Sequence, residues 1–506
     1  MFVAIAVLLL LYLLSSHLIL PIITYLRDPK NLRRYPNFHA LAGLSDLPFL
    51  HASHTGFRSR TLHELHKTHP VLRIGPNALS YGHPDAIKDI YGHGTACVKD
   101  RFYSETSGSH AHLADVVDKQ DHARKRKVLS SAYALKNLED WEFKVADMTR
   151  RLLRAFDGMC TDPLPVNAEV PEKDDLTVDY RAWTNHFTVA AIANIGLSED
   201  LGFLEQGGDR VLSESMDGKV KQVSFRECRE ASGAVTYRLV WAYDWFPTLK
   251  RLSKVFSKYR RLWKLDADWN GIVYNRATTR LKLYLAGEKL EDFLAMMEDK
   301  KGVPHNLEMG EIVAEISIMM NAGSDTTAIS LRNVLFFLLK NPRCMGRLRE
   351  ELDEVLDEDE VVAPYSKVKH LPYLRACIDE SLRMLPPRGP RSWVISFAGH
   401  TSVSMSAYVV HHDESVFTDH NSYQPERWLG KDGKSLQSYF IPFSTGARGC
   451  IGRNISDLEQ TVLLASLVHR YDFALPSPDW DPPIPETTNL SPGPMPLKIW
   501  RRVRVD

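Results

Sequence analysis

Apolar residues recur along most of this chain at the spacing of amphipathic helices. The long stretches with that spacing cover residues 119–156, 178–197, 210–245, 250–300, 306–340, 342–357 and 371–385. Strand-like runs are few: a short hairpin at 71–81, a run at 403–410 and the C-terminal segment 496–505. No internal repeat or second linker divides the pattern, so we expect residues 51–506 to form one mainly helical α+β domain with small sheets.

The first 26 residues differ from the rest because they contain no Asp, Glu, Lys or Arg. A run of about 20 apolar residues is long enough to cross a bilayer. The basic cluster Arg27, Lys30, Arg33 and Arg34 follows it, and such a cluster stays on the cytoplasmic side. A cleaved signal peptide, the alternative, would place basic residues before its apolar core. We therefore expect a transmembrane signal anchor at 1–26 and a basic, proline-punctuated linker at 27–50, ahead of a cytosolic domain.

Charge and cysteine content narrow the possible functions. The 63 basic and 63 acidic side chains give no net charge, so no global field attracts the chain to nucleic acid. The six cysteines form no CxxC pair and have no regular spacing, which argues against a disulfide framework. They suit a reducing compartment in which one thiolate is functional and five thiols are inert.

One ten-residue segment concentrates residues with useful chemistry: Phe443, Gly446, Arg448, Cys450 and Gly452. A helix is expected to follow at 454–469, and a helix N-terminus stabilises a thiolate through its dipole and its free N–H groups. The two glycines permit close backbone approach to the sulfur or to a flat ligand, and Arg448 can pair with an anion. A lone cysteine is usually a structural core residue. The five-position pattern FxxGxRxCxG is very specific, however, and argues for a functional cysteine.

This segment resembles the haem-binding loop of the cytochromes P450, and the chain is most similar to fungal microsomal members of that superfamily. The resemblance implies the P450 fold, preceded by one N-terminal transmembrane helix. It implies haem b bound through an axial thiolate from Cys450. It also implies that Phe443 shields the sulfur, that Arg448 pairs with a haem propionate, and that Gly446 and Gly452 shape the loop.

A second motif lies in the helix expected to begin near Asn306, where residues 322–327 read Ala-Gly-Ser-Asp-Thr-Thr. Taken alone, these small and hydroxyl-bearing residues could mark only a packing notch or a bend. The resemblance implies that Thr326 holds a water molecule and that Asp325 and Thr326 relay protons to the reacting dioxygen.

Glu380 and Arg383 are three residues apart, so they share one face of a helix. Taken alone, such a pair is more often a solvated ion pair worth under about 1 kcal/mol. The resemblance implies instead a buried structural set that also contains Arg427, from the segment Pro425-Glu-Arg-Trp.

The basic run from His122 to Lys127 would ordinarily be a solvated helix face. The resemblance implies that His122 and Arg126 contact the haem propionates. The neighbouring Arg124, Lys125 and Lys127 would then offer a surface to an acidic electron donor.

The stretch between Arg383 and Tyr408 is shorter than is usual in the family. This stretch normally forms a strand pair that lines the pocket and supplies a propionate contact, a role that the resemblance gives to Arg391. Either the hairpin is shortened or part of the sequence has been lost.

The function implied by the resemblance is that of a haem-thiolate monooxygenase in the endoplasmic reticulum membrane, facing the cytosol. It would insert one oxygen atom from O2 into a hydrophobic or aromatic small molecule, in fungal secondary metabolism or xenobiotic oxidation. Electrons would come from NADPH through NADPH–cytochrome P450 reductase, with cytochrome b5 as a further candidate donor. The same fold could instead catalyse desaturation, coupling or dehydration, and a membrane-tethered haem-binding protein without turnover is the alternative from a different class. We expect the pocket walls to come from residues 98–117, 237–246, 319–327 and 489–495, and we expect no nucleic-acid partner.

Overall fold

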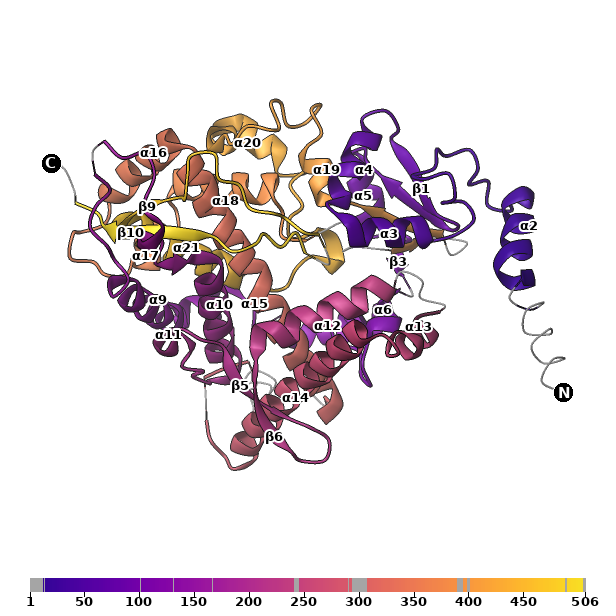
Figure 1. Ribbon diagram of the computed structural model, residues 1–506, viewed down its shortest axis with the longest axis horizontal. Coiled ribbons are helices and arrows are strands. Elements are labelled where there is room, and N and C mark those ends of the chain that lie inside the picture. The colour runs from indigo at the N-terminus through magenta and orange to yellow at the C-terminus, as the bar shows by residue number, and fades with distance from the viewer. Residues whose placement is uncertain are drawn as a thin grey trace.

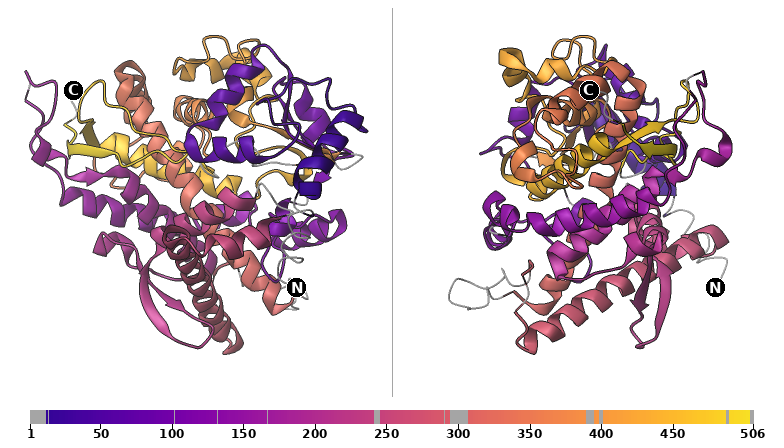
Figure 2. Two further views of the ribbon diagram at one scale, coloured as in Figure 1. Left: turned by 45° about the vertical axis from the view of Figure 1, so that its right-hand side comes forward. Right: turned by 90° about the vertical axis from the view of Figure 1, so that its left-hand side faces the viewer.

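The computed structural model describes residues 12, 14–100, 102–130, 132–165, 167–240, 245–289, 291–293, 307–388, 395–397, 401–486 and 489–503. Helices make up most of the molecule, and the N-terminal third contributes a smaller sheet-containing part around β1 and α3 to α5 (Figures 1 and 2). The α+β class expected from the apolar pattern is confirmed for these residues.

The helices differ widely in length, and the longest, α15, runs through the interior. Their bounds are α2 (Leu20–Arg27), α3 (Leu47–Thr55), α4 (Arg58–His66), α5 (Ala86–Tyr91), α6 (Phe102–Thr106), α7 (Lys119–Leu129), α8 (Leu135–Asp140), α9 (Glu142–Asp157), α10 (Tyr180–Leu197), α11 (Phe203–Gln206), α12 (Phe225–Leu239), α13 (Phe246–Ser253), α14 (Ser257–Leu285), α15 (Met309–Lys340), α16 (Pro342–Asp353), α17 (Tyr365–Val368), α18 (Pro372–Met384), α19 (Ala407–His411), α20 (Gly430–Leu436) and α21 (Arg453–Arg470).

Helix α15 organises the core because its C-terminal half is buried on every side. All residues from Thr327 to Leu338 are buried, and the helix packs against α10, α18 and α21. A helix that is apolar around most of its circumference is stable only when other elements surround it. The contact with α10 is close: a Cβ atom added at Gly323 would lie 2.7 Å from the side chain of Ile192.

Three small sheets complete the fold. The largest has the strand order β1-β2-β8-β7-β3, with bounds β1 (Val71–Gly75), β2 (Ala78–Tyr81), β3 (Val98–Lys99), β7 (Ile395–Phe397) and β8 (Thr401–Met405). A second has the order β4-β10-β9, with bounds β4 (Val178–Asp179), β9 (Tyr471–Ala474) and β10 (Pro496–Arg501). The hairpin predicted at 71–81 is confirmed by the antiparallel pairing of β1 with β2.

The short stretch after Arg383 still forms a strand pair. Strands β7 and β8 are antiparallel, with Ile395 opposite Val403, and three residues of sequence separate them. The short stretch therefore still supplies two strands to the main sheet.

Several expected element boundaries are wrong. Residues 210–224 form a hairpin of β5 (Arg210–Glu214) and β6 (Val220–Ser224), and only then does α12 begin. The stretch 119–156 is divided into α7, α8 and α9, and the run 403–410 is divided between β8 and α19. Helix α15 begins at Met309 with a capping box between Glu308 and Glu311, so the cap is not at Asn306, which lies outside the described residues. These differences are local, because turn residues and caps interrupt an apolar period that continues across them.

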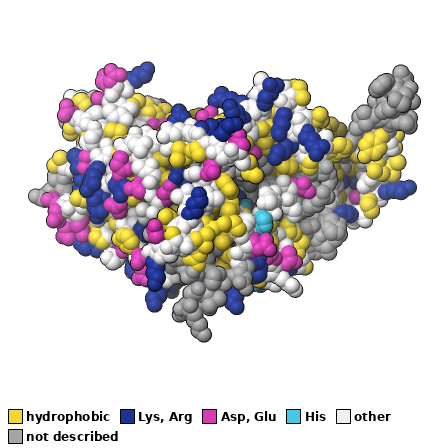
Figure 3. Space-filling view, turned by 90° about the horizontal axis from the view of Figure 1, so that it is seen from below, with side chains coloured by type: hydrophobic (Ala, Val, Ile, Leu, Met, Phe, Trp, Pro, Cys, Tyr) yellow, Lys and Arg dark blue, Asp and Glu magenta, His cyan; other side chains and the backbone are white. Residues whose placement is uncertain are grey.

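Of the expected transmembrane anchor at 1–26, the structure describes residues 12 and 14–26. In the part of residues 12–27 that is described, α2 has eight residues and buries none of them. A search of the described helices finds none with the length and apolar character needed to cross a bilayer. On the face seen in Figure 3, basic and acidic side chains are interspersed, as a chain without net charge leads one to expect.

Candidate active site

Cys450 lies in a tight loop directly before α21. The Cys450 N–H donates to the carbonyl oxygen of Phe443 at 2.9 Å, and Gly452 is the N-cap residue of the helix. Gly446 has a φ of +68°, and a Cβ atom there would lie 1.9 Å from the carbonyl oxygen of Tyr91, so the loop requires glycine at this position. The loop geometry therefore depends on Gly446, whereas a Cβ atom at Gly452 would meet only ordinary contacts at 3.9 and 4.0 Å, and Phe443 closes the loop through its backbone.

Among the six cysteines, all of which the structure describes, Cys450 is the exposed one. Ala322 is also exposed, although it lies inside the longest helix between partly buried neighbours. These exposures indicate a hollow between the Cys450 loop and the middle of α15. Burial by the surrounding protein raises the pKa of Cys450, while the Gly452 N–H and the charges of Arg388 and Arg126 oppose that rise.

Basic side chains gather around this hollow. Arg126 donates to the carbonyl oxygen of Gly449 at 2.6 Å, and Arg448 donates to those of Val116 and Val117 at 2.8 and 3.1 Å. Lys99 is buried and donates to the carbonyl oxygen of Ala114. These cations are therefore anchored by backbone oxygens, which hold their positions without cancelling their charge.

The pKa values show that these cations repel one another. Burial, followed by the charge of Arg448, lowers the pKa of Lys99 to about 7; Asp115 opposes this change, and Arg388 and Arg126 add smaller lowering effects. Burial and the same cationic surroundings lower the pKa of His122 to about 4, so its ring is neutral near pH 7. A set of cations facing a hollow with so little negative charge fits an anionic ligand.

The donor set also fits a haem. A group of three or more His, Cys, Asp or Glu side chains able to hold a metal ion is not found among the described residues. A single exposed thiol with cations around it is the kind of donor set that would hold the iron and the carboxylates of a haem macrocycle. The cations would meet the carboxylates of that macrocycle.

Two residues of this cluster were missed by the sequence analysis, and one expected member falls outside the described residues. Lys99 and Arg388 come from β3 and from the end of the segment after α18, and neither belongs to a recognisable motif. Arg391 lies outside the described residues. The basic run Pro386-Pro-Arg-Gly-Pro-Arg391 contains both arginines, and of the two the structure describes Arg388.

One expected basic surface is wrong in part. Lys125 is buried, and its Nζ lies 2.7 Å from Glu311 and 3.6 Å from Glu315 on α15. Arg124 pairs with Asp121 and also with Glu311. These two side chains join α7 to α15, so Lys127 alone of the three remains exposed without such a pair.

Asp325 is buried and is held by three side chains from distant segments. Its carboxylate accepts hydrogen bonds from Arg181 of α10, Arg229 of α12 and Asn489 near the C-terminus, each at 2.7 Å. Burial alone raises the pKa of Asp325, but Arg229, Arg181 and Asn489 together lower it to about 2. The carboxylate is thus ionised throughout the physiological range.

Thr326 occupies a different side of α15 from its neighbour. Its hydroxyl donates to the carbonyl oxygen of Ala322 at 2.8 Å, and the residue is partly exposed. The structure therefore does not join Asp325 and Thr326 by a direct hydrogen bond. The side chains that hold Asp325 could not be found by local spacing, because they lie 144, 96 and 164 residues away.

Glu380, Arg383 and Arg427 come together in one cluster of hydrogen-bonded charges. Arg383 donates from Nε and Nη2 to the two oxygens of Glu380 at 2.9 and 2.8 Å, and Arg427 Nε donates to Oε1 at 3.0 Å. The indole N–H of Trp428 adds a fourth hydrogen bond at 2.9 Å. The charged groups of Glu380 and Arg383 are completely buried, which is the arrangement expected for this set.

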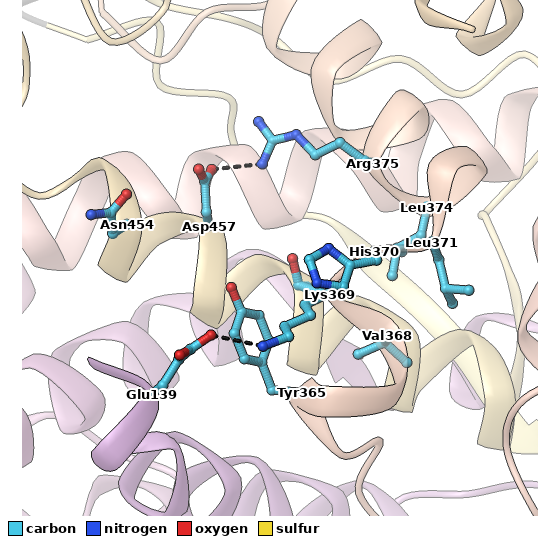
Figure 4. A pocket seen from close by; sticks show the side chains of 11 residues that line it. Glu139, Tyr365, Val368, Lys369, His370, Leu371, Leu374, Arg375, Asn454 and Asp457 are labelled. Atoms are coloured by element: carbon cyan, nitrogen blue, oxygen red, sulfur yellow. Dashed lines mark hydrogen bonds and ion pairs between the residues drawn. The ribbon is translucent and has the colours of Figure 1, made fainter. Parts of the chain in front are cut away.

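A separate pocket of about 230 Å³ lies between α8, α17, α18 and the first turns of α21 (Figure 4). Ion pairs cross it from Lys369 to Glu139 and from Arg375 to Asp457, both at 2.8 Å. Its lining includes none of the predicted site residues. The hollow by Cys450 is therefore a distinct feature.

Comparison with known proteins agrees with this geometry. The family model described as cytochrome P450 matches residues 47–499. Benzoate 4-monooxygenase bphA from Aspergillus niger is 27% identical over 456 residues, which are 86% of each chain. Cytochrome P450 monooxygenase AMT3 from Alternaria alternata is 30% identical over 464 residues, 87% of this chain and 88% of that one. The protein belongs to the cytochrome P450 family and is a monooxygenase of the fungal type.

Proposed function

We propose that this protein uses a haem bound by Cys450 to insert one oxygen atom from O2 into a hydrophobic or aromatic small molecule. The observation that carries this proposal is the exposed Cys450 beside a hollow at which several cations gather and lower one another's pKa. Haem with a thiolate ligand supplies the electron density that favours cleavage of the O–O bond. Arg126, Arg448, Arg388 and Lys99 would hold its propionates, and neutral His122 would donate a hydrogen bond to one of them.

Proton delivery falls to residues of α15. The Thr326 hydroxyl donates its hydrogen to Ala322, which leaves its oxygen free to accept a hydrogen bond from a water in the hollow. Asp325 can take up a proton and pass it on only after one of its arginines moves away, because its pKa is lowered to about 2 in the present arrangement and the carboxylate carries no proton. We therefore assign Thr326 the task of orienting the proton donor and Asp325 the task of supplying protons intermittently.

The substrate proposal rests on the relatives and on the lining. One relative is named for benzoate oxidation, and the part of α15 with exposed or partly exposed side chains beside the Cys450 loop includes Ala322 and Thr326. Small aromatic compounds are therefore the first class to try. A role in fungal secondary metabolism or xenobiotic oxidation would follow from such a substrate.

The electron donor and the location are proposed from the sequence. NADPH–cytochrome P450 reductase, with cytochrome b5 as a second donor, would supply electrons at the endoplasmic reticulum membrane. Residues 1–26 would anchor the protein, and the basic linker 27–50 would keep the catalytic domain on the cytosolic side. The exposed Leu20 and Leu26 of α2 agree with a segment that is covered by lipid.

The test is turnover of benzoate and related aromatic acids and phenols by the full chain, supplied with NADPH and a microsomal reductase. The expected product contains one labelled oxygen when isotope-labelled dioxygen is used. Thr326→Ala should retain the haem spectrum, yet form at least about tenfold less product per NADPH and release hydrogen peroxide instead. Equal coupling in Thr326→Ala and the parent would remove Thr326 from the mechanism.

A further inference from the structure

Four polar side chains bridge α15 and α21 inside an otherwise apolar contact. Thr327 Oγ1 donates to Ser456 Oγ at 3.0 Å, and Gln460 Nε2 donates to the same oxygen at 2.9 Å. Ser330 Oγ donates to Gln460 Oε1. All four residues are buried, and none of their side-chain nitrogen or oxygen atoms is left unpaired.

This bridge lies between the two halves of the proposed site. Thr327 follows Thr326, and one residue turns a helix by about 100°, so one threonine faces the hollow while the next faces α21. On the other helix, the Ser456 N–H donates to the carbonyl oxygen of Gly452 at 3.1 Å. The Gly452 N–H in turn is directed at the Cys450 sulfur. A short series of hydrogen bonds thus connects Thr327 to the thiol.

Apolar packing alone would not fix the position of α21 along α15. Contacts between aliphatic side chains are not directional, whereas a buried polar network is stable only when every partner is in place. A shift of one residue along a helix moves it by about 1.5 Å. Such a shift would break the hydrogen bonds at Ser456 and Gln460 together, so the bridge strongly favours a single register.

We infer that Thr327, Ser330, Ser456 and Gln460 form a clamp that sets the position of the Cys450 thiolate relative to Thr326. They act as positioning residues and make no contact with substrate or oxygen. This inference rests on the proposed function, because it assumes that Cys450 binds the haem iron. A displacement of about 1 Å at a reacting centre can lower a rate by about a hundredfold, so a modest loosening of the clamp is enough to uncouple turnover.

The experiment compares Thr327→Val, which removes the donor and keeps the shape, with Thr327→Ser, which keeps the donor. Resonance Raman spectroscopy of the full-chain haem protein measures the iron–sulfur stretching frequency, and no substrate is needed. Thr327→Val should shift or broaden this band, and Thr327→Ser should restore the parent band. With benzoate as the probe, Thr327→Val should also lower product per NADPH by about threefold to tenfold.

Ser466→Ala is the matched control, because Ser466 is a buried serine on the same α21 whose hydroxyl donates to Val462 at 2.7 Å and accepts from the Ala363 N–H. It should lower stability without changing the band. If Thr327→Val does not accumulate, Ser456→Ala takes its place in the same comparison. An unchanged band in both Thr327→Val and Ser456→Ala, or an equal shift in Ser466→Ala, overturns the clamp. Absence of any iron–sulfur band in the parent would instead refute Cys450 as the ligand.

Discussion

Glu380 and Asp325 are both buried carboxylates that accept hydrogen bonds from arginines, but their partners differ in how far away they lie in the sequence. Glu380 is held by Arg383 one helical turn away and by Arg427, with all the hydrogen-bonding nitrogens of Arg383 in use. Asp325 is held by Arg181, Arg229 and Asn489, each from a separate segment.

The Asp325 set is also less completely satisfied. Arg181 Nη1 and Arg229 Nε are buried and have no hydrogen-bond partner among the described residues. In the Glu380 set, every nitrogen of the Arg383 guanidinium donates a hydrogen bond, so we regard this set as a structural scaffold. The Asp325 set connects α10, α12 and the C-terminal segment, and its arginines still have donors without a partner among the described residues. A carboxylate that exchanges hydrogen-bond partners during a reaction needs surroundings like those of Asp325, in which some donors are not already used.

The substitution with the largest expected effect on stability is Glu380→Gln, which tests whether the Glu380 set is a structural scaffold. Loss of the charge leaves Arg383 and Arg427 buried without a counter-charge, and we expect a loss of about 3–5 kcal/mol in the free energy of unfolding, with little haem-bearing protein formed. Glu64→Gln removes an exposed ion pair with Lys67 and should cost under about 1 kcal/mol. Urea unfolding of both variants gives the measurement, and similar losses would show that the Glu380 set is not a scaffold.

Asp325→Asn should have a smaller effect on stability and a larger effect on turnover. We expect a loss of about 2–3 kcal/mol near neutral pH, because that is the stability linked to lowering a pKa by about two units, and the amide of the variant cannot ionise. The folded-state pKa of Asp325, about 2, lies below its ordinary value of about 4. Its contribution is therefore present above that ordinary value and is lost as the pH falls toward 2.

The variant should thus show a weaker loss of stability below about pH 4 than the parent does. The measurement is urea unfolding as a function of pH, together with NADPH-dependent turnover of the same samples. Identical acid profiles for the two proteins would contradict the paired, ionised state of Asp325.

Asn489→Ala removes the uncharged partner of Asp325 and leaves both arginines in place. A hydrogen bond to a charged group contributes roughly 1.5 kcal/mol or more, so we expect a loss of about that size in the free energy of unfolding. Turnover should change more than it does in the exposed-site variant Glu64→Gln. Loss of stability without any change in turnover would make the C-terminal contact purely structural.

Glu459 adds a third case to the comparison, a buried carboxyl without a hydrogen-bond partner among the described residues. Both of its oxygens are unpaired among the described residues, and burial raises its pKa well above the ordinary value. Because the pKa of Glu459 is higher in the folded state than in the unfolded chain, the protein loses stability as the pH rises from the unfolded-state pKa toward the folded-state pKa. Glu459→Gln should therefore gain up to about 1 kcal/mol near pH 8 and show a flatter dependence of stability on pH. A variant that is less stable than the parent at that pH would imply a partner for Glu459.

The sequence predicted the parts of the site that depend on local spacing. The Cys450 loop and the pairing of Glu380 with Arg383 involve residues a few positions apart. The placement of Arg126 by the loop, 323 residues away in the sequence, is expected only from the family resemblance. The partners of Asp325 could not be predicted, since they depend on how α10, α12 and the C-terminus pack around α15. The β5–β6 hairpin had a local signal, Asp217-Gly218 with a φ of +78° at the glycine, but the apolar period on either side hid it.

The central claim, that Cys450 holds the haem iron, is tested most directly by the absorption spectrum of the reduced protein with carbon monoxide. The parent should show the strongly red-shifted Soret band of a thiolate-bound haem, and Cys450→Ser should lose it. Cys160→Ser, at a half-buried cysteine outside the site, should keep the band. A red-shifted band that persists in Cys450→Ser would contradict the assignment of the ligand and the function built on it.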